Sequence, residues 1–347
     1  MNLLVTGGAG FIGSAFVRLA AALERSGSIT VLDKLSYAGN LENLAPVAAD
    51  PRFRFVRADI CDAEMVHRLV AETRPDAIVH FAAESHVDRS ILSPAPVFET
   101  NLRGTFVLLE AARLHKTARF LHISTDEVYG SIDPPHDADE NYRLRPSSPY
   151  SASKAGSDLL ALSYYATYQL PVVVTRASNN YGPYQFPEKL IPLMIANALE
   201  DKPLPVYGDG MQIRDWLYVE DHCRALFRVL DAGRPGEIYN IGGTRALPNI
   251  EVIRRVLAVT GKPESLIRYV TDRPGHDRRY ALTSEKLIRE TGWKPEVDFE
   301  EGLHRTVEWY RNNKEWVAHV RSGEYQKYYE QNYAHRESSA APQLSPA

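Results

Sequence analysis

The chain has 347 residues, of which 44% are hydrophobic and 24% are charged, and its formal net charge at pH 7 is −4. This length predicts about two domains with a large buried core, and the slightly acidic balance argues against nucleic acid or a membrane as the main partner. No apolar run approaches the ~20 residues needed to span a bilayer, and the two distant cysteines favour a reducing, cytoplasmic location.

The first half of the sequence alternates short apolar strands with helices. The predicted strands are residues 3–5, 29–32, 52–56, 77–81, 119–124 and 172–174, and the predicted helices are residues 11–25, 97–115 and 150–169. Such alternation predicts an α/β fold, a Rossmann-like doubly wound parallel sheet with helices on both faces.

The sequence changes character after residue 180, where prolines interrupt short elements. We therefore expect a Rossmann domain over residues 1–180 and a smaller α+β substrate lobe over residues 181–335. A segment near 210–245 is expected to return to the first domain, because residues 237–241 are typical of a further strand. The polar, proline-containing end at 336–347 is predicted to be a disordered tail.

A glycine-rich turn follows the first predicted strand and begins the first helix. Gly7, Gly10 and Gly13 have the spacing of a dinucleotide-binding turn, and Asp33 ends the next strand. Glycines allow backbone N–H groups to approach a pyrophosphate, and the acidic residue accepts hydrogen bonds from a ribose. The carboxylate repels a 2′-phosphate, which favours NAD over NADP, although the adjacent Lys34 weakens this argument.

Residues 124–130 (STDEVYG) and the pair Tyr150 and Lys154 are the candidate catalytic cluster. The pair lies four residues apart at the start of a helix, so both side chains share a face. A lysine charge ~4 Å from a tyrosine contributes about 4 kcal/mol at an effective dielectric of 20, enough to make the phenol a usable base near neutral pH. This pattern indicates hydride chemistry on an alcohol, and the adjacent Asp126 and Glu127 indicate a second proton transfer after the oxidation.

With these motifs, the sequence resembles the extended short-chain dehydrogenase/reductase family, and within it the nucleotide-sugar dehydratases. Matching segments run across nearly all of the chain: 7–13 (GGAGFIG), 33–40 (DKLSYAGN), 82–90 (AAESHVDRS), 124–130, 178–183 (SNNYGP), 187–190 (PEKL), 214–216 (RDW) and 272–276 (DRPGH). Several segments are shared with sugar-nucleotide epimerases, but the epimerases lack the carboxylates that follow Ser124 and Thr125. The sequence departs from the usual family pattern at 176–177 and around 243–247.

The resemblance implies dehydration of dTDP-glucose through C4 oxidation by NAD, loss of water across C5 and C6, and hydride return to C6. Tyr150, supported by Lys154, is expected to take the C4 hydroxyl proton while Thr125 positions that oxygen. Glu127 is expected to act as the base at C5, and Asp126 as the acid at the C6 hydroxyl. Neighbouring carboxylates raise one another's pKa, which favours a protonated acid at neutral pH.

The resemblance also implies two sets of binding residues. The residues expected to bind the cofactor are Gly7, Gly10, Phe11, Ile12, Gly13, Asp33, Lys34, Leu35, Ser36, Asp59, Ile60, Ala82, Ala83, Ser85, Thr100, Tyr150, Lys154 and Asn180. The residues expected to bind the sugar nucleotide are His86, Thr125, Asn179, Lys189, Leu190, Pro205, Tyr207, Arg214, Asn249, Asp272, Arg273 and His276. No metal site is expected, since none of the 11 histidines has metal-ligand spacing.

The helices near residues 97 and 150 are expected, from the same resemblance, to form a homodimer interface. Two other functions stay open at this point. One is a UDP-sugar 4-epimerase or decarboxylase of the same family, which the Asp126 and Glu127 pair argues against. The other is a non-catalytic NAD-binding sensor, which should tolerate the loss of Tyr150.

Overall fold

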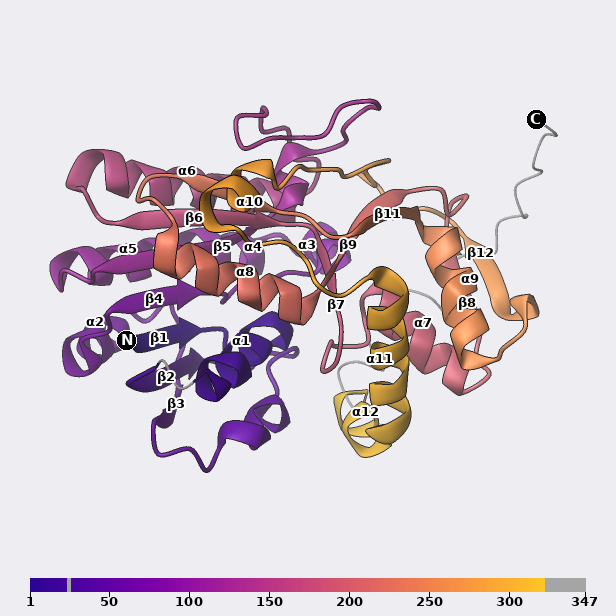
Figure 1. Ribbon diagram of the computed structural model, residues 1–347, viewed down its shortest axis with the longest axis horizontal. Coiled ribbons are helices and arrows are strands. Elements are labelled where there is room, and N and C mark those ends of the chain that lie inside the picture. The colour runs from indigo at the N-terminus through magenta and orange to yellow at the C-terminus, as the bar shows by residue number, and fades with distance from the viewer. Residues whose placement is uncertain (24–25, 322–347) are drawn as a thin grey trace.

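The computed structural model describes residues 1–23 and 26–321, and its largest element is a seven-stranded parallel sheet (Figure 1). The strand order is β10-β6-β5-β4-β1-β2-β3, and every neighbouring pair is parallel. The strands are β1 (Asn2–Thr6), β2 (Ser28–Asp33), β3 (Phe53–Arg57), β4 (Ala77–His80), β5 (Arg119–Thr125), β6 (Val172–Ala177) and β10 (Ile238–Ile241). The strand order reverses between β1 and β4, which is where ligands bind in such sheets. The predicted doubly wound α/β fold is confirmed.

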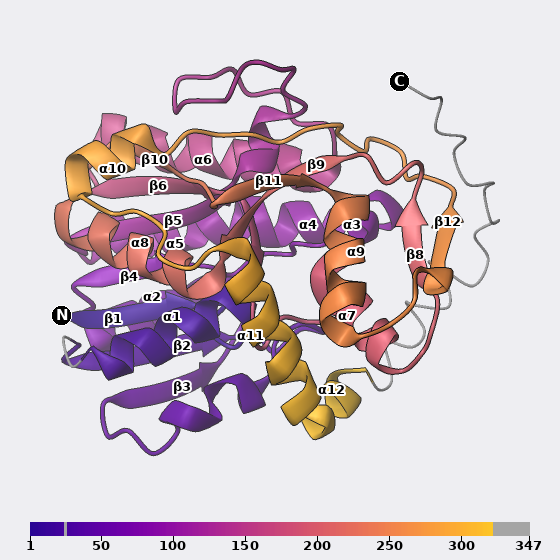
Figure 2. The ribbon, with the colours of Figure 1, turned by 45° about the vertical axis from the view of Figure 1, so that its right-hand side comes forward.

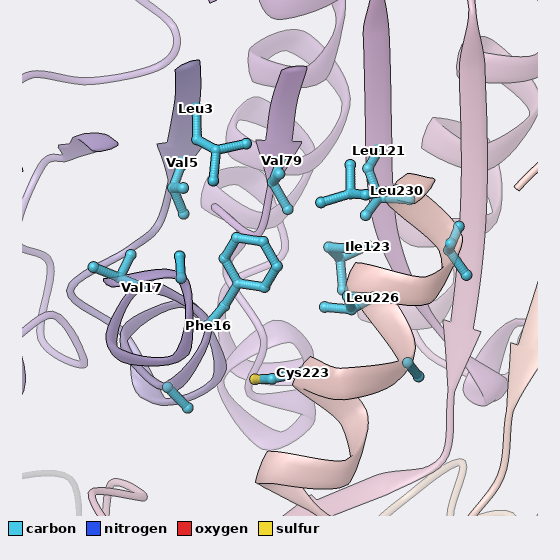
Figure 3. Close-up of a cluster of buried hydrophobic side chains, with 14 of the residues drawn as sticks. Leu3, Val5, Phe16, Val17, Val79, Leu121, Ile123, Cys223, Leu226 and Leu230 are labelled. Carbon is cyan, nitrogen blue, oxygen red and sulfur yellow. The ribbon is translucent and has the colours of Figure 1, made fainter. Parts of the chain in front are cut away.

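Helices cover both faces of this sheet. On one face lie α1 (Phe11–Ala22) and α8 (Val219–Ala232), and on the other lie α2 (Ala63–Thr73), α5 (Thr105–Leu114) and α6 (Pro149–Tyr168). Figure 3 shows the first of these two cores, with side chains of α1 and α8 meeting those of the central strands. Fully burying each large apolar side chain contributes roughly 1.5–3 kcal/mol. The two cores together hold the strand ends that line the site in fixed positions.

The predicted helix at 97–115 is not continuous. It is divided into α4 (Ala95–Phe98), the π-helical turn η2 (Glu99–Gly104) and α5. Within η2, the buried Asn101 amide donates to the Glu84 carbonyl (3.0 Å) and to Ser153 Oγ (2.9 Å), and its oxygen accepts from Glu84 N (2.9 Å). These contacts join the turn to the loop after β4, and π-helical turns of this kind are frequent at functional sites.

A smaller lobe lies beside the carboxyl ends of the sheet strands, as the two ribbon views agree (Figures 1 and 2). It has its own hydrophobic core, formed between helices and two small sheets of order β11-β9-β7 and β12-β8. Its elements are β7 (Asn179–Tyr181), α7 (Leu190–Leu199), β8 (Leu204–Tyr207), β9 (Ile213–Tyr218), β11 (Arg245–Pro248), α9 (Asn249–Thr260), β12 (Ile267–Val270), α11 (Phe299–Asn312) and α12 (Lys314–Val320). The short elements that remain are η1 (Leu41–Val47), α3 (Val87–Leu92), η3 (Asp126–Tyr129), η4 (Glu264–Leu266) and α10 (Glu285–Thr291).

The chain passes between the two parts more than once. After the first elements of the lobe, α8 packs against the sheet and β10 pairs in parallel with β6. The helix α10 comes later in the sequence but also packs against α8 and β10. The expected tail at 336–347 lies outside the described residues, as does 322–335 of the expected lobe. Within the described part of the chain, no helix combines the length and apolar character needed to span a bilayer.

Candidate active site

A cleft of about 420 Å³ lies at the carboxyl ends of the sheet strands, and both the sheet and the lobe contribute to its walls. The glycine turn after β1 forms one end, and the loops and helices of the lobe form the other. The carboxyl end of β5 and the first turns of α6 lie between these ends. The cleft therefore places a dinucleotide turn, a hydroxyl, two carboxylates and a Tyr/Lys pair around one space.

At the glycine turn, the backbone itself forms the wall of the cleft. Gly7 has φ +69°, and a Cβ atom there would lie 2.5 Å from the Ala82 nitrogen. A Cβ atom on Gly13 would lie 2.3 Å from the Gly7 carbonyl oxygen. Only glycine fits both places, so the chain comes close to the space where a pyrophosphate would sit at the start of α1. These residues fit a bound dinucleotide.

Acidic side chains line the ribose end of this half of the cleft. The Asp33 carboxylate accepts from the backbone nitrogens of Ala9 (3.0 Å) and Leu35 (2.8 Å), and burial raises its pKa. Lys34 Nζ lies 3.6 Å from Asp59 Oδ2 and 3.5 Å from Glu84 Oε1. The lysine charge is thus engaged by two carboxylates, which weakens its attraction for a 2′-phosphate and favours NAD.

Thr125 ends β5 and caps the short helix η3, which fixes the two carboxylates that follow it. Its Oγ1 accepts from Glu127 N (3.2 Å) and lies 3.3 Å from Asp126 Oδ1. The Asp126 side chain is buried, whereas Glu127 is half-buried. Adjacent residues in one turn point in different directions, so the two acids meet different parts of the cleft.

The charged neighbours of these two acids differ. Burial and the neighbouring charges of Glu127 and Asp215 raise the pKa of Asp126 well above its ordinary value, with weaker opposing effects from Arg214 and from the Thr125 hydrogen bond. Burial also raises the pKa of Glu127, but the charges of Arg273, Lys189 and Arg214 oppose that shift. The protonated form is therefore favoured more strongly at Asp126 than at Glu127, where three cations limit the rise in pKa.

Tyr150 and Lys154 lie on the first turns of α6, and both are buried. Lys154 Nζ donates to the Ile123 carbonyl (2.7 Å). Burial lowers the pKa of Lys154 to about 8, with an opposing effect from the charge of Asp158. Burial and the nearby Glu127 raise the pKa of Tyr150, whereas a hydrogen bond with Thr125 lowers it. The pKa of Tyr150 is thus shifted opposite to the lowering that the sequence predicted, because burial and the charges of Glu127 and Asp126 raise it.

Cationic and polar side chains come from the lobe to the opposite wall. Arg273 Nε lies 3.5 Å from Asp88 Oδ1, and Tyr207 donates to Asp88 Oδ2 (2.8 Å). Arg214 is buried, with its guanidinium 4.0 Å from the centre of the Tyr280 ring. Two arginines with planar donor groups suit a diphosphate.

Most of the predicted residues line the cleft. All five expected catalytic residues do so, as do all the expected cofactor residues except Leu35 and Asp59 and all the expected substrate residues except Asp272. Leu35 and Asp59 lie behind Asp33 and Lys34, which they contact. Asp272 accepts from His276 Nδ1 (2.6 Å) and from Gln212 Nε2 (2.8 Å), so it reaches the cleft through His276.

Sequence reasoning missed several polar residues of the cleft. Glu188 is buried beside Arg89 (3.4 Å) and accepts from Tyr37 (3.0 Å), and burial raises its pKa to about 7. His222 Nδ1 lies 2.9 Å from Asn180 Oδ1. Glu188 stands inside the quoted PEKL segment and was detectable there as an acid next to Lys189. His222 lies in a helix with no motif, so no local signal marks it.

Comparison with known proteins agrees with this geometry. The sequence matches the family model described as GDP-mannose 4,6 dehydratase over residues 4–306. It is 54% identical to the dTDP-glucose 4,6-dehydratase of Shigella flexneri, over 97% of this chain and 100% of the relative. It is 56% identical to the enzyme of the same name from an Actinoplanes species, over 91% of this chain and 99% of the relative.

Two solved structures place the fold among neighbours of different activity. DesIV of Streptomyces venezuelae, a dTDP-glucose 4,6-dehydratase solved with NAD bound, has a TM-score of 0.90 and 54% identity, covering 92% of this chain and 100% of that chain. A UDP-glucose 4-epimerase of Thermus thermophilus, in complex with NAD, has a TM-score of 0.84 and 35% identity, covering 90% and 100%. The fold is shared by both activities, but the sequence is nearer to the dehydratase. The chain therefore belongs to the dTDP-glucose 4,6-dehydratase family.

Proposed function

We propose that this chain is an NAD-dependent lyase that converts dTDP-glucose to dTDP-4-keto-6-deoxyglucose. The observation that carries the proposal is the pair Asp126 and Glu127, which lines the same cleft as Tyr150 and Lys154 and has different charged neighbours at its two members. The near full-length relatives of this name support the substrate.

The residues of the cleft supply the proton transfers that this reaction needs. Bound NAD would be held at the glycine turn and Asp33, where it would supply a hydride acceptor for C4, a hydride donor for C6 and a positive charge that favours the phenolate form of Tyr150. Tyr150 takes the proton of the C4 hydroxyl, and Thr125 holds that oxygen within reach of the phenol. The C4 ketone then makes the neighbouring C5–H acidic enough for Glu127 to remove its proton.

The second carboxylate completes the elimination. Asp126, whose pKa is raised by burial and by neighbouring carboxylates, gives its proton to the C6 hydroxyl, and this group leaves as water. Glu127 returns a proton to C5 after reduction at C6. A positioned acid and a positioned base each contribute roughly 10²–10⁴ in rate. Because the hydride is taken and returned, the reaction involves no net redox change and the cofactor does not need to leave.

The product identifies the reaction. Incubation of the protein with dTDP-glucose should give a 4-keto-6-deoxy sugar nucleotide, measured by the absorbance that this product develops in alkali. Parallel reactions with UDP-glucose and GDP-glucose measure the base preference, and turnover should be highest with dTDP-glucose. A galactose nucleotide as the product would instead establish the epimerase reading and overturn the proposal.

We also infer a homodimer formed through α4, α5 and α6. Large apolar side chains are exposed on these helices, including Phe106 (46% exposed), Leu114 (54%) and Leu159 (58%). Such exposure is typical of an interface when the side chains gather on neighbouring helices. Sedimentation at micromolar concentration should give twice the chain mass for the native protein and a smaller mass for Leu159→Asp; a monomeric native protein would contradict the interface.

The division of labour between the two parts follows from the same function. We infer that the described part of residues 1–180, with the returning segment near 210–245, serves as the cofactor domain, and that the described part of residues 181–335 serves as the sugar-nucleotide lobe. We also infer a cytoplasmic location, which the two free cysteines, Cys61 and Cys223, support.

A further inference from the structure

Behind the Tyr/Lys pair lies a buried charged cluster that the proposed reaction does not use. It consists of Asp158, Arg176, His122 and Tyr129, and the exposed fraction of each side chain is 2% or less. Arg176 Nε donates to Asp158 Oδ2 (2.9 Å), and an Nη1 hydrogen is donated to the Tyr129 hydroxyl (3.0 Å). Burying an ion pair costs several kcal/mol of desolvation per charge, and apolar residues of similar volume would fill the same space without that cost. Packing alone therefore does not explain why these charged residues lie here.

The position of Asp158 connects this cluster to the active site. Tyr150, Lys154 and Asp158 follow one another at intervals of four residues on α6, so they share one face of that helix. This face meets the strands: Lys154 donates to the Ile123 carbonyl on β5, and Asp158 pairs with Arg176 on β6. A carboxylate thus stands one helical turn behind the lysine that supports the catalytic tyrosine.

Other titratable groups face Lys154 from the neighbouring strands. Burial and the charge of Lys154 lower the pKa of His80 on β4 and of His122 on β5, that of His122 to about 4. Both rings are therefore neutral near pH 7. Burial opposes ionisation of Asp158, but the hydrogen bond from His122 and the charge of Arg176 lower its pKa on balance. Asp158 is therefore the ionised group whose charge favours the ammonium form of Lys154.

We propose that Asp158 is a positioning residue that acts through Lys154: its carboxylate, fixed in place by Arg176, keeps the lysine ammonium charged behind Tyr150. Without that carboxylate, a lysine buried to this degree releases its proton at a lower pH. A neutral lysine no longer stabilises negative charge on the Tyr150 oxygen as the C4 proton is taken.

The test measures the C4 oxidation step, in which Asp126 and Glu127 transfer no proton. The holoenzyme is mixed with dTDP-glucose, and the first phase of cofactor reduction is recorded across pH for the native protein and two variants. Asp158→Asn removes the carboxylate charge and keeps the side-chain shape. The pH at which the rate falls on the alkaline side (the alkaline fall) should decrease by about one unit. Arg176→Gln keeps the carboxylate and removes its partner; its alkaline fall should stay in place or move up.

A structural role would give a different pattern from a charge effect. If both variants lower the rate equally at every pH and leave the alkaline fall unmoved, the assignment is overturned. Asp158→Asn leaves Arg176 buried without its carboxylate, so the double variant Asp158→Asn/Arg176→Gln covers the case in which the single variant fails to fold. The double variant should follow Asp158→Asn in the direction of its shift, and an unmoved alkaline fall there also overturns the assignment.

This assignment rests on the proposed function, and the two fail separately. A native protein that makes no 4-keto-6-deoxy product overturns the function itself. An active native protein whose Asp158→Asn variant keeps the native pH dependence overturns only the role of Asp158.

Discussion

The two ends of the cleft are built in different ways. At the glycine turn, the shape comes from the backbone: Gly7 and Gly13 leave no room for a Cβ atom, and Asp33 is held by two backbone nitrogens. At the carboxyl end of β5, the cleft is instead shaped by side-chain charge, because Asp126 and Glu127 differ mainly in the charges around them. The first end depends on close approach of backbone segments, and the second depends on the charges of side chains.

Because the two ends are built differently, they should tolerate different amino-acid substitutions. A backbone site fails when atoms are added, and a charged site fails when a proton or a charge is removed. Each of the following predictions addresses one end of the cleft and leaves the other intact.

The largest effect is expected from Tyr150→Phe at the charged end. The variant loses the group that takes the C4 proton but keeps the ring, so turnover of dTDP-glucose should fall by roughly 10²–10⁴ with little change in thermal stability. The control is Tyr142→Phe, a tyrosine outside the cleft, which should retain native turnover. Native activity in Tyr150→Phe would favour a non-catalytic NAD-binding protein.

At the backbone end, Gly7→Ala should destabilise the protein by about 3 kcal/mol, because the added Cβ atom meets the Ala82 backbone at a positive φ. Gly261 gives the matched control: it has φ +72° but no atom within 4 Å of an added Cβ, so Gly261→Ala should cost only about 1–2 kcal/mol. Thermal unfolding with and without added NAD measures both effects. Only Gly7→Ala should also lose stabilisation by NAD; equal losses in the two variants would mean that close approach of the backbone is not required.

The smallest effect concerns the acid side of the pH profile. Glu127 must be ionised to act as a base, and burial already raises its pKa, while the charge of Arg273 opposes that shift. Arg273→Gln should therefore raise the pKa of Glu127 further, and the acid fall in kcat should move up by about one pH unit. The control is Arg278→Gln, whose native arginine pairs with Asp209 at the surface and should leave the profile unchanged. An acid fall that stays in place in Arg273→Gln would contradict the assignment of Glu127.

The sequence predicted the backbone end of the cleft almost completely. A glycine turn depends on neighbours within a few residues and on the order of strand, turn and helix, all of which are visible in the sequence. The π-helical turn at η2 was not predictable, because it depends on Asn101 meeting Glu84 and Ser153 from two other segments.

The charged end was predicted in its residues but not in its electrostatics. Motif spacing placed Thr125, Asp126 and Glu127 together, yet the raised pKa of Tyr150 follows from burial that no local pattern reports. The pairing of Asp158 with Arg176 joins α6 to β6 and likewise has no sequence signal. Long-range contacts between side chains are thus what the sequence alone could not supply.

The division of roles between Asp126 and Glu127 is the central claim, and Glu127→Gln tests it most directly. The holoenzyme of this variant, mixed with dTDP-glucose, should show reduced-cofactor absorbance that accumulates while little or no 4-keto-6-deoxy product forms, since C4 oxidation does not need the base at C5. Formation of the product at the native rate, with no accumulated absorbance, would contradict the claim.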